Sequence, residues 1–315
     1  MRQMGTKMTL SGPSIPAAMA ESTDTRLLSI DNLDLHLLAG RDFAAVADAV
    51  GLLREATYRK QLSGSGDERD LDGRDAHYDH LLLVERSTGE LAGTARLQFV
   101  PLGAEDLPGS NGSYLEHVYP GIKADLARRE SHLEIGRVAL AQRFQRQPHS
   151  LMALFRGGLL LAANSGYQLL HGLVSYNHFA YSDAVNTAFL QALMRPPYRR
   201  EGASLPAARH PITGIEADDT PHPSGHIQAL EQEIRHSISE EFRLPVLLRQ
   251  YFNLMQAQVC GLSLAKDFNQ ITEILMAADL NRLPPERLAM FIDLPHQPIY
   301  HRFSWYRGSQ TSHER

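Results

Sequence analysis

Several kinds of feature are scarce or missing in this sequence, and each absence excludes a class of protein. Cys260 is the single cysteine among 315 residues, so neither an intramolecular disulfide nor a cysteine-based zinc site can form. The most apolar stretch, residues 151–163, is interrupted by Arg156 and is well short of the roughly 20 residues that span a membrane as a helix. Residues 1–25 hold no continuous apolar segment of the kind that a secretory signal needs. We therefore expect a cytoplasmic protein without a transmembrane segment.

The charge balance excludes further partners. The formal net charge is −5 and the pI is near 6.3, so no basic excess exists to neutralise nucleic-acid phosphates, and no nucleic-acid partner is expected. The 15 histidines include no HExxH motif, and His171 and His178 have no carboxylate at ligand spacing, so no metal is expected either. Hydrophobic residues make up 43% of the chain and charged residues 21%, which is enough apolar material to bury a core.

Hydrophobic periodicity predicts alternating helices and strands in the first two thirds of the chain. An apolar face that repeats with helical spacing indicates an amphipathic helix over residues 43–60. Two apolar runs around the turn residues 87–90 indicate a β-hairpin, and a strand–helix–strand unit follows, which is nearly always a right-handed crossover. The expected elements are strands 80–85 and 91–100, strand 132–140, helix 151–165 ended by Gly166, strand 169–175 and helix 183–193.

The last third begins with a segment that lacks periodicity. Residues 195–224 contain six prolines and are expected to form a loop or lid. An acidic helix over 227–241, a helix over 245–255 and a strand over 271–278 follow. We divide the chain into a flexible lead (1–25), a core (26–194), the proline-rich loop (195–224), a C-terminal extension that completes the domain (225–295) and a tail (296–315).

Short sequence strings, taken in order, resemble a known family. Residues 53–59 (LREATYR), 72–75 (DGRD), 79–82 (DHLL), 89–97 (GELAGTARL) and 134–137 (EIGR) are similar to successive motifs of the acyl-homoserine lactone synthases and of the ornithine-lipid N-acyltransferases. Residues 244–251 (LPVLLRQY) and 267–270 (DFNQ) resemble strings of the ornithine-lipid group, which the lactone synthases lack. The resemblance covers about residues 52–291.

This resemblance implies a fold and a reaction. The fold would be α/β with a mixed sheet, the GNAT-like acyl-CoA N-acyltransferase fold with a C-terminal extension. The reaction would move a long acyl chain, which could carry a 3-hydroxyl group, from acyl carrier protein to the α-amine of an amino acid, with ornithine as the leading acceptor. Two alternatives stay open: a synthase of N-acyl amino acid signals with another acceptor, and a catalytically silent module that binds carrier protein.

The donor site departs from the family pattern. GNAT enzymes usually have a glycine-containing turn that holds the pyrophosphate of coenzyme A, but residues 143–150 contain no glycine. The start of the following helix still offers free N–H groups and a positive dipole end, so Arg143, Arg146 and Ser150 are our candidates for binding the single phosphate of a 4′-phosphopantetheine arm. This favours acyl carrier protein over free coenzyme A as donor, with no tightly bound cofactor. Solvated surface arginines are the alternative interpretation.

Aminolysis of a thioester needs a proton acceptor and a site for the acceptor amine. Glu134 is the candidate general base, and the alternative is a buried partner of Arg137 that orders the core. By the resemblance, a paired cluster lines the acceptor site, and it consists of Arg54, Asp72, Asp75, Arg96 and Arg137. For the two aspartates the alternative is a solvated acidic loop.

A covalent enzyme intermediate is disfavoured. No GxSxG elbow surrounds Ser175, and Cys260 lies in an apolar segment, where an inert thiol is expected. Direct attack of the amine on the thioester is therefore predicted. The apolar side of residues 245–255 could touch a membrane from which a lipid product leaves, so peripheral contact with the inner membrane is an open alternative to packing in the core.

Overall fold

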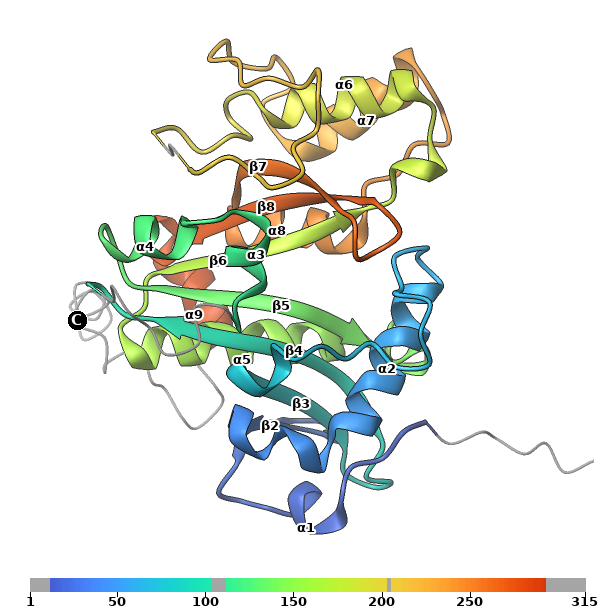
Figure 1. Ribbon diagram of the computed structural model, residues 1–315, viewed down its shortest axis with the longest axis vertical. Coiled ribbons are helices and arrows are strands. Elements are labelled where there is room, and N and C mark those ends of the chain that lie inside the picture. The colour runs from blue at the N-terminus through green and yellow to red at the C-terminus, as the bar shows by residue number, and fades with distance from the viewer. Residues whose placement is uncertain (1–11, 104–111, 203–204, 293–315) are drawn as a thin grey trace, which may run out of the picture.

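The computed structural model describes residues 12–103, 112–202 and 205–292, and in these residues an eight-stranded sheet forms the centre of the molecule (Figure 1). The strands lie in the order β1-β2-β3-β4-β5-β6-β8-β7, and neighbouring strands are antiparallel except β5 and β6, which are parallel. The expected mixed α/β architecture is confirmed. The strands are β1 (Arg26–Ile30), β2 (Leu33–Leu38), β3 (Asp79–Glu85), β4 (Leu91–Val100), β5 (His132–Leu140), β6 (Leu169–Tyr176), β7 (Gln258–Ala265) and β8 (Ile271–Asp279).

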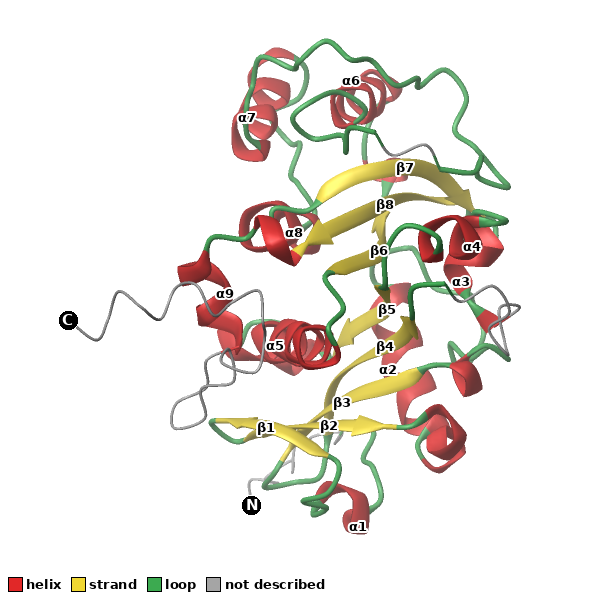
Figure 2. Cartoon of the chain, turned by 90° about the vertical axis from the view of Figure 1, so that its left-hand side faces the viewer, coloured by secondary structure: helices red, strands yellow, loops and turns green. Residues whose placement is uncertain are grey.

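Helices cover both faces of this sheet. Figure 2 shows α5, α8 and α9 on one face and α2, α3 and α4 on the other, while α6 and α7 pack together beyond β7. The helices of the described residues are α1 (Ala17–Ala20), α2 (Ala47–Arg59), α3 (Tyr114–Val118), α4 (Ile122–Ala127), α5 (Pro148–Ser165), α6 (Asp183–Leu193), α7 (Ile227–Ser237), α8 (Val246–Met255) and α9 (Pro285–Ile292). None of these helices has the length and apolarity to cross a membrane.

Burial on both faces explains the continuous apolar runs of the central strands. Along β3, Leu81 and Leu83 belong to the core that includes α5, whereas Leu82 and Val84 belong to the core that includes α2. Successive side chains of a strand point to opposite faces, so a strand covered on both sides needs apolar residues at every position. This two-sided covering places β4 and β5 in the interior.

The predicted strands and helix 183–193 are confirmed to within one residue at each end. Helix α5 begins at Pro148, three residues earlier than expected, and ends at Gly166, which takes the left-handed conformation with φ of 75°. The acidic helix ends at Ser237 rather than at 241, because the chain turns there to bury Phe242 against Phe189 of α6. The described part of the proline-rich loop contains no helix or named strand.

The expected flexible lead is partly packed. Ile15 is buried in the core under α2, and the backbone of residues 13–15 pairs with the turn between β3 and β4 through Leu91 N–H to Pro13 O (2.8 Å) and Ile15 N–H to Gly89 O (3.3 Å). An apolar side chain beside the exposed edge of a hairpin is enough to order this segment. Residues 1–11 and the tail, 296–315, lie outside the described residues.

Strands β1, β2 and β7 were not predicted. In β2 the sequence LDLHLL places Asp34 and His36 in the interior, where a polar residue breaks the apolar pattern that marks a buried strand. Asp34 is tolerated there because Arg86 donates two hydrogen bonds to it, at 2.7 and 3.2 Å, and Ser29 donates a third at 2.6 Å. Arg86 lies 52 residues further along the chain, so a local sequence window does not show this compensation.

The two parallel strands separate part-way along their length. Residues 132–135 of β5 pair with residues 169–172 of β6, and no pairing follows. On its other side β5 carries a register shift against β4, and Arg137 has a φ of 51°, which identifies a bulge that bends the strand. Beyond Ile135 and Gly172 the strands therefore diverge.

Replacing Gly172 with alanine should destabilise the fold by about 1–3 kcal/mol. A Cβ at this position would lie 2.9 Å from the carbonyl oxygen of Ile135, so β5 and β6 would have to move apart. Gly136→Ala is the matched control, because its new Cβ would come no closer than 3.8 Å to Arg96. Equal midpoints for the two variants in urea unfolding would contradict this account of the close approach.

Candidate active site

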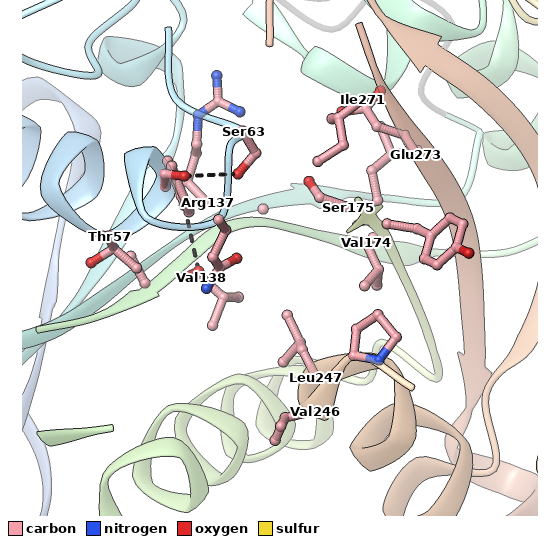
Figure 3. A pocket seen from close by; sticks show the side chains of 18 of the residues that line it. Thr57, Ser63, Arg137, Val138, Val174, Ser175, Val246, Leu247, Ile271 and Glu273 are labelled. Atoms are coloured by element: carbon pink, nitrogen blue, oxygen red, sulfur yellow. Dashed lines mark hydrogen bonds between the residues drawn. The ribbon is translucent and has the colours of Figure 1, made fainter. Parts of the chain in front are cut away.

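A cavity of about 740 Å³ opens where β5 and β6 diverge. Residues 136–140 of β5 form one wall and residues 173–176 of β6 form the other, and the start of α8 closes the end. Figure 3 shows Arg137 and Val138 on one side, Val174 and Ser175 on the other, and Leu247 at the apolar end. Glu273 of β8 lies on the β6 side. The cavity is thus polar near the sheet centre and apolar toward α8.

A cluster of alternating charges supports the β5 wall. Arg54 donates to Asp75 at 2.8 Å, and Arg96 donates to the same oxygen at 3.0 Å and to Asp72 at 3.2 Å. Arg137 pairs with Asp70 at 3.1 Å and with Asp72 at 3.7 Å. The structure therefore brings together all five residues that the sequence singled out for the acceptor site, and it adds Asp70.

The members of the cluster differ in their access to the cavity. Arg96 and Arg137 line it, whereas Arg54, Asp72 and Asp75 do not, and they act on the cavity only through those two arginines. Arg54 is fully buried and Asp75 is 2% exposed, so the solvated-loop interpretation is wrong for Asp75. Asp72 remains about a quarter exposed.

Burial and neighbouring arginines have opposite effects on the pKa values of the aspartates. Burial alone would raise the pKa of the Asp75 carboxyl, but Arg54 and Arg96 beside it hold that pKa well below its usual range. The pKa of Asp72 is lowered in the same way, mainly by Arg96. For Asp70, burial outweighs the attraction of Arg137 and the pKa is raised. The cluster is held together by charges that burial would otherwise disfavour.

Aromatic rings cover the arginines that reach the cavity. The guanidinium of Arg96 lies 4.4 Å from the centre of the Tyr78 ring, and that of Arg137 lies 3.9 Å from Phe268 and 5.1 Å from Tyr114. Cation–π contacts of this kind strengthen when water is excluded. Phe268 belongs to the DFNQ string near the C-terminus, so this string contributes directly to the wall formed by the first half of the chain.

Glu134 is almost fully buried and lines the cavity. Its Oε1 accepts from the Tyr78 hydroxyl at 2.5 Å and from Leu115 N–H at 3.1 Å, and its Oε2 accepts from the Ser113 hydroxyl at 2.6 Å. The alternative prediction of an Arg137 partner is wrong, because Arg137 turns to the aspartates instead. Three donors make Glu134 the anchor of the α3 start, and its role as the general base stays a prediction.

Of the three predicted donor-binding residues, one lines the cavity and two do not. Arg146 lines the cavity next to the first turn of α5. Arg143 does not: it pairs with Glu85 and with Glu90 (3.4 Å) at the end of the β3–β4 hairpin, because the turn before α5 directs its side chain away from the opening. Ser150 is fully buried and does not line the cavity either, although its hydroxyl has no hydrogen-bond partner within the described residues.

Glu273 lines the cavity and was not among the site residues predicted from the sequence. It is 4% exposed, and burial raises its pKa to about 7 against the opposing effect of the hydrogen bond from Tyr114. The signal was present, since Glu273 is a charged residue inside the otherwise apolar run 271–278. A carboxylate enclosed in this way is characteristic of functional sites.

Comparison with known families decides the class of the domain. Residues 53–155 match the family model described as the acetyltransferase (GNAT) domain. This segment is a GNAT domain. It runs from α2 to α5 and includes Arg54, Arg96, Glu134 and Arg137. The expected GNAT-like fold is therefore confirmed. No curated protein matches the sequence.

Solved structures resemble the chain only distantly. FeeM, an N-acyl amino acid synthase from uncultured soil microbes, is 13% identical with a TM-score of 0.41, and the match covers 84% of this chain and 98% of FeeM. The loading GNATL domain of CurA from Lyngbya majuscula is 13% identical with a TM-score of 0.41, covering 80% and 100%. The acyl-homoserine lactone synthase LasI is 12% identical with a TM-score of 0.39, covering 84% and 97%.

Removing the charge of Asp75 should destabilise the GNAT domain strongly. Asp75→Asn leaves Arg54 and Arg96 buried without their shared counter-charge, and breaking such a buried pair costs roughly 3–5 kcal/mol. Asp72→Asn is the matched control and should cost less, because Asp72 is partly exposed. Urea unfolding followed by circular dichroism measures both, and an equal loss would contradict the central position of Asp75.

Acid should destabilise the domain before ordinary carboxylates titrate. Burial, with repulsion by Arg54, lowers the pKa of His80 to about 4, whereas an unfolded histidine titrates near 6.5. The folded state binds this proton less readily, so the stability is complete above about pH 6.5 and falls toward pH 4, by roughly 3 kcal/mol at most. His80→Gln should make Tm less dependent on pH between about pH 6.5 and pH 4. The control His149→Gln, at an exposed histidine, should leave the dependence unchanged.

Proposed function

We propose that the protein is an N-acyltransferase that moves a long-chain fatty acyl group, which can carry a 3-hydroxyl group, from acyl carrier protein to the α-amine of an amino acid, with ornithine as the first acceptor to test. The observation that carries the proposal is the cavity between β5 and β6 in a GNAT domain, which joins a polar end at Arg137 and Glu273 to an apolar end at Leu247 and Tyr251. A polar amine and an acyl chain need such a division.

The unpaired part of β5 supplies the donor site in this proposal. Past Ile135 the strand no longer pairs with β6, so backbone groups on that side face the cavity. Buried backbone N–H and C=O groups need partners, and the amides of a pantetheine arm provide them. In the proposed reaction the same N–H groups would stabilise the oxyanion that forms when the amine attacks the thioester carbon.

Charges at the opening favour a carrier-bound donor. Arg146 and the first turn of α5 lie at one side of the cavity and Arg243 lies at the other. Acyl carrier proteins are acidic, so positive charge around the opening guides their approach even though the net charge of the chain is negative. The segment 143–150 lacks the glycine turn that suits the pyrophosphate of coenzyme A.

Membrane contact through residues 245–255 gains no support from the packing. Leu248, Tyr251 and Met255 of α8 are buried in the core, and Val246 is the exposed large apolar side chain of this helix. One exposed valine offers too little apolar surface for stable insertion at a bilayer interface. The proposed function therefore includes no contact with a membrane.

Mass spectrometry of reactions with 3-hydroxyacyl carrier protein and a mixture of amino acids should detect N-acyl-ornithine, with less product from the matching coenzyme A thioester. A dominant product with another amino acid would favour a signal synthase. Stable binding of loaded carrier protein with no acylated amine would favour a silent binding module and contradict the enzyme.

Arg146 at the opening allows a second test, of where acyl carrier protein docks. Arg146→Ala should raise the KM for acyl carrier protein roughly tenfold with kcat little changed, because a charge at the rim of an interface acts mainly on association. Arg143→Ala, three residues away and outside the cavity, is the matched control. Equal KM values for the two variants would move the docking site away from the start of α5.

A further inference from the structure

Glu273 differs from the other acidic residues of the interior. Asp75 is matched by two arginines and Glu134 by three hydrogen-bond donors. Glu273 receives one hydrogen bond, from the Tyr114 hydroxyl to Oε1 at 2.9 Å, and its Oε2 has no hydrogen-bond partner within the described residues. A buried carboxylate costs free energy unless it is paired, so an incompletely paired one on a cavity wall calls for a functional explanation.

Several neighbours act on the charge of Glu273. Tyr114 and Arg137 favour the ionised form, as does Ser263, which faces Glu273 across the β7–β8 ladder without reaching hydrogen-bond geometry. Burial and the negative charge of Asp267 oppose ionisation. Tyr119, at the end of α3, interacts electrostatically with Glu273. The balance leaves a carboxyl that gains and loses a proton near neutral pH, with a pKa of about 7.

We propose that Glu273 is the general base that accepts the proton of the attacking amine. The assignment rests on the proposed acyl transfer and deepens it. Glu273 lies on the β6 side of the cavity, across from Arg137 and Val138 on β5 (Figure 3). A thioester held along β5 and an amine held against Glu273 would meet in the space between the two strands. Glu134 then acts as a positioning residue that holds the start of α3, and with it Tyr114.

The proton balance of the step is complete. The neutral amine nitrogen attacks the thioester carbonyl carbon, so a C–N bond forms and the C–S bond breaks. Glu273 takes the proton that the nitrogen releases and returns it to the departing thiolate of the pantetheine arm. An amide and a free thiol are the products, and the carboxylate is regenerated without any other reactant.

The experiment compares pH profiles of kcat for the wild type, Glu273→Gln and Glu134→Gln with acyl carrier protein as donor. Glutamine keeps an oxygen that can accept from Tyr114 but cannot take a proton. We expect Glu273→Gln to lower kcat at least about 100-fold, within the range for a lost general base. The decrease of kcat below about pH 7, the acid limb of the profile, should disappear in this variant. The KM for the donor should stay unchanged. Glu134→Gln should retain that acid limb.

A second variant separates catalysis from folding. Tyr114→Phe removes the hydrogen bond that favours the ionised carboxylate, so the pKa of Glu273 should rise and the acid limb should move to higher pH. A purely structural role of Tyr114 would lower kcat without moving the limb. Unchanged far-ultraviolet circular dichroism is the condition for comparing the variants, and Glu273→Asp, which keeps a titrating group, should retain a limb at reduced kcat.

The outcomes distinguish this assignment from the proposed function. An active wild type whose kcat and acid limb survive Glu273→Gln would overturn the role of Glu273, and loss of the limb in Glu134→Gln would transfer that role to Glu134. A wild type that acylates no amine with any donor would overturn the acyl-transfer function itself and the base with it.

Discussion

The separation of β5 from β6 after four paired residues is the constraint on which the rest of the structure depends. Gly172 lets the strands approach closely before that point, and the bulge at Arg137 bends β5 away after it. A parallel pair that separates inside a sheet leaves backbone polar groups that must find other partners. The cavity, its polar wall and the room for a substrate all follow from this one break in hydrogen bonding.

A bent strand needs support, and the charged cluster supplies it. Arg137 has a conformation that is uncommon for a residue with a side chain, and its guanidinium is fixed by Asp70, Asp72 and two aromatic rings. Asp75 in turn fixes Arg96 and Arg54. These ion pairs need not make the fold more stable than apolar packing would. Losing one member, however, leaves the others as unpaired charges in the interior, which is strongly destabilising. The cluster therefore holds the geometry of the β5 wall while only two arginines touch the cavity.

Local patterns were enough to predict the strands and helices of the centre, because elements covered on both faces carry long apolar runs. The resemblance also gave the cluster, from Arg54 to Arg137, before any contact was known. Three features were missed or predicted wrongly, and each has a physical reason. Arg143 was assigned to the donor site by its position before a helix, but its side chain forms ion pairs with Glu85 and Glu90 of the hairpin instead. Strand β2 contains the buried Asp34, which is paired with Arg86 from a distant part of the sequence, so its polar residue did not suggest a buried strand. Glu273 gains its role only where β8 lies beside β6.

The two walls of the cavity come from different parts of the chain. The GNAT match, residues 53–155, contains β5, Arg137 and Glu134 but ends before β6 begins. The opposite wall, with Ser175 and Glu273, the apolar end at α8 and the ring of Phe268 over Arg137 all come from later residues. A GNAT domain by itself would therefore offer half a cavity. In the proposed reaction, residues from both parts of the chain would contact the acyl chain and the amine, because both parts line the cavity.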